Sequence, residues 1–412
     1  MERLDVVGMP AGGWSELGET ARQVIAAAEV LLGGRRHLDL VPDNASTRDR
    51  IWWPSPLRPA LPGLLERYAG RRVVVLASGD PRGSGIGTTL IELLGPAAVR
   101  IHPAVSSVAL ARARMGWPSE DVTVVTVVGR DLGLVRRHLG PDRRLVVLSS
   151  GSDTPTELAQ LLVDAGYGPS VLTVHADLGT EAETRSRVRA DDAVTQRSLV
   201  DAPRLNLVAV ECRSAAGTRP LGPGPGLPDD VFDSDGQLTK RDLRASALAR
   251  LAPIPGELLW DLGAGAGSIA IEWARTDPHC RAIAVDRVPD RSARITANAA
   301  RLGVPDLRVI TADVSTTIEW LPRPAAIFIG GGAENDLIRR CWHLLPPGGR
   351  LVVHAVTVET EQVVLRAWRA FGGELIRIGV ERMESLGGFH GWKPARAVVQ
   401  WAAVRGADGA SS

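Results

Sequence analysis

Three glycines alternate with small residues in the segment "LLWDLGAGAGSIAIEW", residues 258–273. An apolar run precedes the glycines and ends at Asp261, and a helix-like pattern follows them. This order is typical of a strand, a tight turn and a helix start, where free backbone N–H groups can bind a ligand. Gly263, Gly265 and Gly267 form G-x-G-x-G, whereas the dinucleotide fingerprint is G-x-G-x-x-G. The spacing alone therefore does not identify the ligand.

Two acidic strand ends narrow the choice of ligand. Asp286 ends the run "AIAVD", about 20 residues after the loop, where a carboxylate can accept hydrogen bonds from both hydroxyls of a ribose. Asp313 ends "VITAD", where a side chain can meet an adenine amino group. A glycine loop and two such acids in consecutive strands fit a nucleoside without a pyrophosphate, such as S-adenosylmethionine (SAM). The predicted SAM-binding residues here are Gly263, Ala264, Gly265, Ala266, Gly267, Asp286, Ala312 and Asp313. A plain turn with solvated aspartates, or an NAD site, remains the alternative.

A second glycine-rich turn lies in "VVVLASGDPRGSGIGTTL", residues 73–90. It reads as a strand, a loop and a helix, and Asp80 with Pro81 fixes a turn within the loop. The small residues let a ligand approach the main chain closely. No G-K-[ST] follows, which argues against a nucleoside triphosphate site. The residues alone indicate either a pocket lined by backbone or a simple connecting loop.

The composition limits the kinds of partner. A chain of 412 residues is too long for one ordinary core, so we expect two domains. A net charge of +1 gives no reason to expect a nucleic-acid partner. Cys212, Cys280 and Cys341 lie far apart without a C-x-x-C spacing, which fits a reduced cytoplasmic protein without a metal site. No apolar run approaches the roughly 18 residues of a membrane span, and the chain opens on a strand-like segment, so no membrane partner is expected.

The pattern along the chain predicts two α/β domains. Residues 214–230 are rich in proline and glycine and read as a linker between a domain at 1–213 and a domain at 231–405. In the first domain, a break at 116–121 divides the strands and helices into two lobes. In the second, regular alternation argues for an open, mostly parallel sheet, with a helix beginning near an N-cap at Thr239. The strands of the second domain are expected at 258–263, 281–286, 307–313, 325–331 and 350–356.

From about residue 236 to 405 the chain resembles the class I SAM-dependent methyltransferases. The resemblance implies a Rossmann-like fold and places Thr239 at the SAM site. Three further segments, "TKRDLRA", "AIFIGGG" and "LPPGGRLVVHAVTVET", belong to the same resemblance.

The first part of the chain resembles the tetrapyrrole methylases, which have the two-lobed class III SAM-dependent fold. The resemblance rests on the G-D-P turn together with "VVGMPAGG", "PAVSSVALARARMGW" and "GTEAETR". It implies that a second SAM binds this domain and that the cleft between the lobes holds the macrocycle. The SAM-binding residues that it implies are Gly79, Asp80, Pro81, Ser84, Gly85, Ser106 and Ser107.

The fusion of these two domains resembles the bifunctional, decarboxylating methyltransferases of cobalamin biosynthesis. It implies that an anionic precorrin is methylated at the meso carbons C5 and C15 and loses carbon dioxide from the acetate at C12, giving precorrin-8X. One methylation and the decarboxylation would belong to the second domain, and the other methylation to the first. Relatives of both halves assemble into oligomers, so a homo-oligomer is expected.

Candidate substrate and catalytic residues follow the fourth and fifth strands of the second domain. Gly330, Gly331 and Gly332 would let the flat macrocycle approach the methyl group. Glu334 is either a base or the cap of the next helix, and His354 is either a proton donor or a satisfied structural histidine.

A basic cluster closes the list of candidates. His390 and Lys393, in "LGGFHGWKPAR", either hold carboxylates of the substrate or lie on a solvated hairpin.

Two rival functions also remain open at this point. One is a methyltransferase for RNA or another small molecule with an inactive first domain, and the other is a sensor of SAM or tetrapyrrole without turnover.

Overall fold

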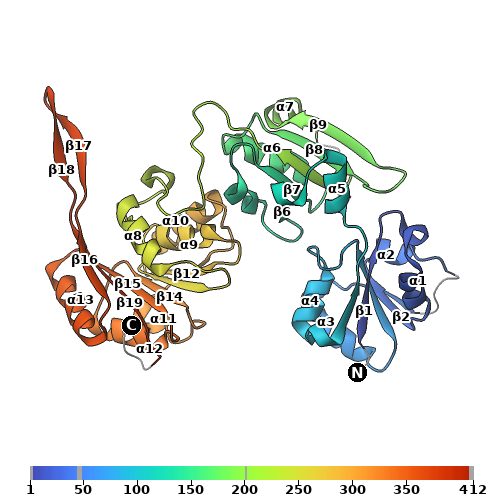
Figure 1. The fold of residues 1–412 in the computed structure, drawn as a ribbon, viewed down its shortest axis with the longest axis horizontal. Coiled ribbons are helices and arrows are strands. Elements are labelled where there is room, and N and C mark those ends of the chain that lie inside the picture. The colour runs from blue at the N-terminus through green and yellow to red at the C-terminus, as the bar shows by residue number, and fades with distance from the viewer. Residues whose placement is uncertain (1–2, 44–48, 200–201, 408–412) are drawn as a thin grey trace. The chain divides into compact units, whose positions relative to one another are not determined.

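The computed structural model describes residues 3–43, 49–199 and 202–407. The chain forms two compact units (Figure 1). The N-terminal unit comprises Met1–Leu132 and Gly140–Thr218, and the C-terminal unit comprises Gly133–Leu139 and Arg219–Ser412. Each unit is described by itself below.

The first lobe of the N-terminal unit contains a five-stranded, fully parallel sheet in the order β3-β2-β4-β1-β5. One apolar cluster packs the sheet against α1 and α2, and a second packs its other face against α3 and α4. A parallel sheet that is buried on both faces exposes only its ends, so the carboxyl ends of its strands offer a ligand site. The elements are β1 (Leu4–Met9), α1 (Glu19–Ala26), β2 (Val30–Gly33), α2 (Arg35–Asp39), β3 (Asp49–Trp52), α3 (Leu57–Arg67), β4 (Val73–Ser78), α4 (Ile86–Leu94) and β5 (Val99–His102).

The second lobe contains a five-stranded mixed sheet in the order β6-β7-β10-β8-β9. Only β6 and β7 run parallel, and the remaining neighbours are antiparallel. Its elements are α5 (Ser107–Met115), β6 (Val122–Thr126), β7 (Arg144–Leu148), α6 (Thr154–Asp164), β8 (Val171–Ala176), β9 (Thr184–Arg189), α7 (Ala190–Gln196) and β10 (Asn206–Glu211). Short 3-10 turns lie at Gly13–Glu16, Pro96–Ala98, Ser119–Asp121, Leu132–His138 and Asp229–Val231.

The boundary between the lobes lies before α5, so the predicted break at 116–121 is wrong. Ala111 of α5 and Trp117 pack in one cluster with Val146 of β7 and Leu207 of β10. The helix therefore belongs to the second sheet. The chain passes between the lobes at residues 103–106, where the short segment after β5 leads into the helix.

The C-terminal unit contains a seven-stranded sheet in the order β13-β12-β11-β14-β15-β19-β16. The first five strands in this order run parallel, and β19 runs antiparallel to β15 and β16. The expected Rossmann-like, mostly parallel sheet is confirmed. Its elements are α8 (Arg241–Leu251), β11 (Leu258–Leu262), α9 (Ser268–Thr276), β12 (Arg281–Asp286), α10 (Pro289–Arg301), β13 (Arg308–Thr311), α11 (Val314–Thr317), β14 (Ala326–Ile329), α12 (Asn335–Leu344), β15 (Arg350–Ala355), α13 (Val358–Phe371), β16 (Glu374–Ile378) and β19 (Val398–Val404).

Helices cover both faces of this sheet. Helices α8, α9 and α10 pack on one face, and α11, α12 and α13 pack on the other. The strand order reverses between β11 and β14, and such a reversal opens a crevice at the carboxyl ends of the strands. A two-stranded hairpin, β17 (Glu381–Leu386) and β18 (Phe389–Pro394), extends away from the sheet (Figure 1).

A buried ion pair anchors the segment that leads into α8. Arg244 is fully buried, and its Nε donates to Oε1 of Glu272 over 2.5 Å. The same carboxylate accepts the N–H groups of Gly226 (2.6 Å) and Leu227 (2.9 Å). Part of the predicted linker is therefore packed against α9. Two more bonds of Arg244 reach the carbonyl oxygens of Leu227 and Thr239.

The helix predicted to have its N-cap at Thr239 starts one residue later. Helix α8 begins at Arg241, and its N-cap is Lys240, which makes no side-chain capping bond. The prediction of Thr239 as the N-cap is therefore wrong. The reason is that Arg244 binds the carbonyl oxygen of Thr239 from inside the helix, which fixes that residue outside the first turn.

We expect Glu272→Gln to lower the free energy of unfolding by about 3–5 kcal/mol, because it removes the buried counter-charge of Arg244 and leaves only the partly exposed carboxylate of Asp229. Chemical unfolding of the full chain, followed by near-ultraviolet circular dichroism, measures the change. The matched control is Asp336→Asn, which breaks an exposed pair with Arg339 and should cost at most about 1 kcal/mol. Equal losses in the two variants would contradict the anchoring role of the buried pair.

Candidate functional site

A cavity of about 540 Å³ opens in the C-terminal unit where the strand order reverses. The turn after β11, the ends of β12 and β14, and the segment before α8 all contribute to its wall. The predicted site residues on this wall are Thr239, Gly263, Ala264, Gly265, Asp286, Asp313, Gly330, Gly331, Gly332, Glu334 and His354. Three further predicted residues, Ala266, Gly267 and Ala312, adjoin it in sequence without lining it.

The glycine turn requires a left-handed backbone at each glycine. The φ angles are +72° at Gly263, +58° at Gly265 and +76° at Gly267, a region that favours glycine. A Cβ at Gly267 would lie 2.6 Å from Cγ2 of Ile295, so this glycine lets α9 approach α10. A Cβ at Gly265 would lie 2.6 Å from the carbonyl oxygen of Gln237. The turn is thus enclosed by the segment before α8.

The carboxylate of Asp286 is held in a fixed orientation by two backbone N–H groups. It is buried and accepts the N–H of Gly265 at Oδ2 (2.9 Å) and the N–H of Val288 at Oδ1 (3.0 Å). One bond at each oxygen fixes the orientation of the group and leaves further lone pairs for a ligand. This arrangement fits the ribose-binding role predicted from the sequence.

Asp313 is exposed and caps the short helix α11. Its Oδ1 accepts from the backbone N–H (2.8 Å) and the hydroxyl (2.5 Å) of Ser315, and these bonds lower the pKa of the carboxyl group. The group is therefore ionised at neutral pH. Its other oxygen, Oδ2, has no bond within the part of the chain that the structure describes, which leaves an acceptor for an amino group at the cavity edge.

Asp261 is a cavity residue that the sequence analysis passed over. It lies one residue before the end of β11, is completely buried, and accepts the N–H of Ala270 at Oδ2 (3.0 Å). Its Oδ1 has no partner among the described residues. Burial, and to a smaller extent the charge of Asp286, raises the pKa of Asp261 to about 7. The signal in the sequence that could have identified this position is an acidic residue two positions before the first glycine of the turn.

Glu334 lines the cavity and occupies the N-cap position of α12, but its side chain makes no capping bond. Glu334 therefore does not make the hydrogen bond expected of a capping side chain, and its exposed carboxylate stays available to a ligand. Gly330, Gly331 and Gly332 are also exposed on the wall. Small exposed residues there leave room for a flat ligand.

His354 has the environment of a structural histidine. It is buried, its Nε2 lies 2.8 Å from Oε1 of Gln400, and its ring meets Phe328 edge to face with centroids 5.0 Å apart. Burial lowers the pKa of His354 to about 4. The imidazole is neutral at pH 7, which disfavours the alternative of a cationic proton donor.

His390 and Lys393 lie on the β17–β18 hairpin and do not line the cavity. Lys393 is paired with Glu384 of the neighbouring strand over 2.8 Å. Both residues are exposed. The structure thus places them on a solvated hairpin, which was one of the two alternatives drawn from the sequence.

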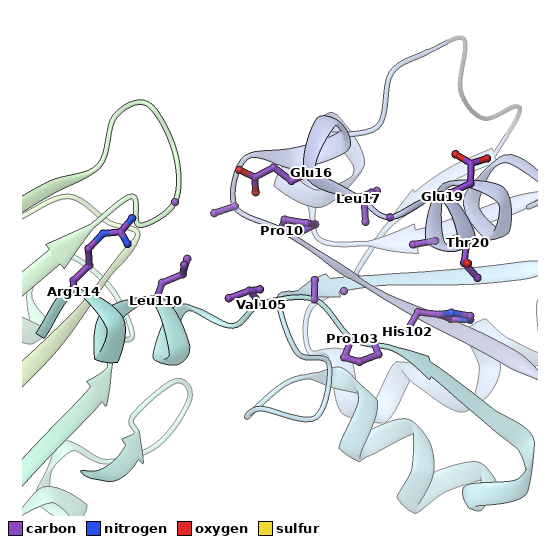
Figure 2. Close-up of a pocket in the computed structure, with 16 residues that line it drawn as sticks. Pro10, Glu16, Leu17, Glu19, Thr20, His102, Pro103, Val105, Leu110 and Arg114 are labelled. Carbon is purple, nitrogen blue, oxygen red and sulfur yellow. The ribbon is translucent and has the colours of Figure 1, made fainter. Parts of the chain in front are cut away.

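A second cavity, of about 680 Å³, lies in the N-terminal unit (Figure 2). Its walls come from the ends of β1 and β5, from the first turn of α1, and from Leu110, Arg114 and Gly179 of the second lobe. Figure 2 shows His102, Pro103 and Val105 along one side of it. This cavity also lies at the carboxyl edge of a parallel sheet.

The predicted G-D-P turn adjoins this second cavity through the backbone. The N–H of Gly79 donates to the carbonyl oxygen of Met9 (2.9 Å), and the carbonyl oxygen of Gly79 accepts from Ala104 (3.0 Å). A Cβ at Gly8 would lie 1.8 Å from that carbonyl oxygen. Gly79 therefore sits directly against two wall residues, Gly8 and Ala104, although it does not line the cavity itself.

The other predicted residues of this unit shape the loops. Asp80 accepts the N–H of Arg82 (2.9 Å), and a Cβ at Gly85 would lie 2.6 Å from the carbonyl oxygen of Pro81. Ser84 has a φ of +61°. Ser106 caps α5 by accepting the N–H of Ala109 (3.1 Å), and Ser107 is the first residue of that helix. The structure assigns these side chains no place in the cavity wall.

His102 lines the second cavity and pairs with Asp5, its Nε2 lying 2.8 Å from Oδ1 of the carboxylate. The two residues come from neighbouring strands, β1 and β5. Nothing in the sequence connected them, because a contact between strands leaves no local pattern.

Within residues 3–43, 49–199 and 202–407, no group of three or more His, Cys, Asp or Glu side chains could hold a metal ion. No helix in the same ranges has the length and apolar character to cross a membrane.

Comparisons with known proteins agree with the two folds. The family described as "Tetrapyrrole (Corrin/Porphyrin) Methylases" matches residues 3–194, and the family described as "Precorrin methyltransferase domain" matches residues 230–405. A Sinorhizobium protein named precorrin-6Y C(5,15)-methyltransferase (decarboxylating) is 43% identical over 405 residues, which are 98% of this chain and 96% of the relative.

Two shorter relatives each match less than half of the chain. A probable cobalt-precorrin-6B C(15)-methyltransferase (decarboxylating) of Saccharolobus solfataricus is 33% identical over 158 residues, 36% of this chain and 78% of the relative. A cobalt-precorrin-7 C(5)-methyltransferase of Salmonella typhimurium is 33% identical over 183 residues, 44% of this chain and 87% of the relative.

The two folds, each with a cavity at the carboxyl edge of a parallel sheet, define a chain that joins two methyltransferase domains. The near full-length identity then identifies the particular family. The chain belongs to the precorrin-6Y C5,15-methyltransferases (decarboxylating).

The raised pKa of Asp261 predicts a pH-dependent stability. Between 3.8 and about 7 the native carboxyl group holds a proton that the unfolded chain releases, so the contribution of Asp261 to the free energy of unfolding falls as the pH rises through this window, whereas the lowered pKa values of His37 and His354 contribute the opposite slope. The loss is about 1.4 kcal/mol per unit of pKa difference. Asp261→Asn should remove the contribution of Asp261 and make the protein more stable than the wild type above about pH 7.

Chemical unfolding at a series of pH values measures this slope. Asp313→Asn is the matched control, because the lowered pKa of Asp313 places its titration below 3.8, outside the window. A wild type and an Asp261→Asn variant with the same slope would contradict the assignment.

Proposed function

We propose that this chain methylates a precorrin-6Y-type tetrapyrrole at C5 and C15 and removes carbon dioxide from its acetate at C12, with SAM as the methyl donor, in cobalamin biosynthesis. The observation that carries the proposal is the presence of two cavities, one in each of two unrelated methyltransferase folds, in a single chain. The named Sinorhizobium relative extends over 98% of the chain, which favours this reading over an RNA methyltransferase with an inactive first domain.

Each unit is proposed to bind its own SAM. In the C-terminal unit, Asp286 would hold the ribose, Oδ2 of Asp313 would meet the adenine, and the turn around Gly265 would lie against the rest of the ligand. The unpartnered Oδ1 of buried Asp261 favours a polar or cationic ligand in this cavity. In the N-terminal unit, the backbone around Gly79 and the wall of the second cavity would hold the other SAM.

The two activities are proposed to be divided between the units. The C-terminal domain, residues 231–405, would carry one methylation and the decarboxylation, and the N-terminal domain, residues 1–213, the other methylation. The two shorter relatives support a division of the activities, since each matches less than half of this chain and one is named for C(15) methylation with decarboxylation, the other for C(5) methylation.

The chemistry asks mainly for positioning. Bound SAM supplies an electrophilic methyl group, and the conjugated nitrogens of a reduced tetrapyrrole make its meso carbons nucleophilic. Holding the two reactants in line can supply ~7–11 kcal/mol of the barrier. Glu334 is the proposed base for the meso proton in the C-terminal unit, because its carboxylate lies on the wall without a capping bond. The neutral, buried His354 would hold Gln400 and β14 in place and would not donate a proton.

The C-terminal SAM site can be tested without the tetrapyrrole. Calorimetric titration of the full chain with SAM should show two sites, and Asp286→Ala should leave one, because it removes the proposed ribose acceptor and frees the N–H of Gly265. We expect the affinity at the lost site to fall at least about a hundredfold, since two hydrogen bonds to a charged group are removed.

The control for this titration is Asp290→Ala, which changes an exposed carboxylate in the first turn of α10 and should keep both sites. A wild type with a single SAM site would contradict the proposal of one SAM per unit. Mass spectrometry with a precorrin substrate then tests the division of labour. Asp286→Ala should abolish decarboxylation and one methyl transfer together.

We further propose that the chain self-associates through its hairpin. Four large apolar side chains on β17 and β18, Met383, Leu386, Phe389 and Trp392, are each more than half exposed. They form two cross-strand pairs, Met383 with Trp392 and Leu386 with Phe389. An isolated two-stranded hairpin is marginal in water, so a second hairpin from another copy of the chain is the proposed cover.

The double variant Phe389→Ser with Trp392→Ser should shift the chain toward the monomer, because it removes an aromatic side chain from each pair. Light scattering coupled to size-exclusion chromatography measures the mass. Trp320→Ser is the matched control, since Trp320 is also exposed (56%) but lies away from the hairpin, after α11. A wild type that is already monomeric, or a double variant with the wild-type mass, would contradict the proposed interface.

The cytoplasm is the proposed location. Cys212, Cys280 and Cys341 are buried and free, and thiols in this state are typical of a reducing compartment.

A further inference from the structure

Three neighbouring strands of the N-terminal sheet bring an arginine, a histidine, a serine and a tryptophan to one edge. We propose that this edge, with Arg36 as its anion-binding group and Trp52 as a stacking surface, binds a carboxylate side chain of the tetrapyrrole beside the N-terminal cavity. The inference rests on the proposed function and adds to it a substrate-binding site outside the two cavity walls.

The topology places these residues together. Trp52 ends β3, Arg36 and His37 follow β2, and Ser78 ends β4. The three strands are neighbours in the order β3-β2-β4 and run parallel, so their carboxyl ends meet at the same edge. Ligands of open parallel sheets bind at this edge.

Hydrogen bonds hold the guanidinium of Arg36 in place. Its Nη2 donates to Oγ of Ser78 (3.3 Å), and Oγ of Ser78 lies 2.8 Å from Nε2 of His37. Burial, and then the charge of Arg36, lowers the pKa of His37 to about 4, so the ring is neutral. A neutral ring can accept the proton of the serine hydroxyl at Nε2. The guanidinium of Arg36 then donates to the hydroxyl of Ser78, and that hydroxyl donates to the ring of His37.

The remaining donors of Arg36 are available to an anion. Only Nη2 has a bond within the described residues, which leaves Nε and Nη1, and no described carboxylate lies within ion-pair distance of the group. Burial lowers the pKa of Arg36, and the more distant charge of Asp177 only partly offsets this effect. The group still carries its charge at pH 7. A charged guanidinium with free N–H groups binds a carboxylate through charge-assisted hydrogen bonds.

Trp52, at the end of the neighbouring strand β3, adds a flat apolar surface to the same edge of the sheet. Its side chain is 62% exposed, and the guanidinium of Arg35 lies 5.5 Å from the centre of its ring. Exposed indole rings bind flat conjugated ligands by stacking. A macrocycle with acidic side chains combines the two features that this edge recognises, a ring system and carboxylates.

The edge lies next to the proposed methyl donor. Ser78 is followed directly by Gly79, whose carbonyl oxygen binds Ala104 of the cavity wall. The cavity therefore begins on one side of the Ser78–Gly79 turn, and the Arg36 group lies on the other. A tetrapyrrole held at the edge would present its ring to a ligand in the cavity.

A carboxylate at Arg36 has two possible sources, the tetrapyrrole or the methionine part of SAM. Kinetics of the full chain separate them. For the methylation assigned to the N-terminal unit, followed by mass spectrometry, Arg36→Gln should raise KM for the tetrapyrrole at least about tenfold and change kcat less than about twofold. The affinity for SAM, measured by calorimetry, should stay at its wild-type value. A loss of SAM affinity with an unchanged KM would assign the carboxylate to SAM and overturn the inference.

Three further variants make the test specific. Ser78→Ala, which removes the hydroxyl that positions Arg36, should raise KM by a smaller factor than Arg36→Gln, and Trp52→Ala should raise it about tenfold. The matched control is Arg58→Gln, which changes an exposed guanidinium of α3 paired with Glu92 and should leave KM unchanged. A wild-type KM in both Arg36→Gln and Trp52→Ala would overturn the inference.

A stable probe removes the dependence on the reactive substrate. Uroporphyrin, which carries carboxylates on all its pyrrole rings, should bind the full chain more weakly in Arg36→Gln, and its methyl ester should bind the wild type more weakly than the free acid. Equal binding of acid and ester would overturn the inference. The proposed function fails separately, if the wild type transfers no methyl group to a precorrin.

Discussion

The buried ion pair between Arg244 and Glu272 is the constraint on which the C-terminal site depends. Removing two charges from water costs several kcal/mol for each ion, and such a pair persists only when further hydrogen bonds satisfy both groups. Here the carboxylate also accepts two backbone N–H groups, and the guanidinium also binds two carbonyl oxygens and Asp229. The pair therefore organises a stretch of chain in which the described residues form no helix or strand other than the short 3-10 turn at Asp229–Val231.

That stretch encloses the glycine turn. The side-chain amide of Asn298 donates to the carbonyl oxygens of Asp233 and Ala266. The carbonyl oxygen of Gln237 in turn accepts the N–H of Ala266 (3.0 Å). Asp286 holds the same turn from the side of β12. The turn is thus fixed from two directions before any ligand arrives. Such preorganisation suits a reaction in which the protein mainly positions its reactants.

The sequence predicted the elements that carry strong local patterns and failed where a distant residue decides. The apolar runs gave β11, β12 and β15 almost to the residue, because buried parallel strands are continuous in hydrophobicity. Thr239 was misjudged as a cap because Arg244 takes its carbonyl oxygen, and the lobe boundary was misplaced because α5 packs on the second sheet. The pairing of His102 with Asp5 depends on the folded sheet, so no local pattern shows it.

In the N-terminal unit, Gly8 and Gly79 meet as bare backbone, since even a single methyl group at position 8 would fall within 1.8 Å of the carbonyl oxygen of Gly79. Neither glycine has a side chain that could change its conformation when the backbone of the other moves. The end of β1 and the turn after β4 therefore form one rigid joint, and a shift of either must move the other with it. If the turn at Ser78 moves, the backbone of the cavity wall at Gly8 must therefore move as well, because no flexible side chain lies between them.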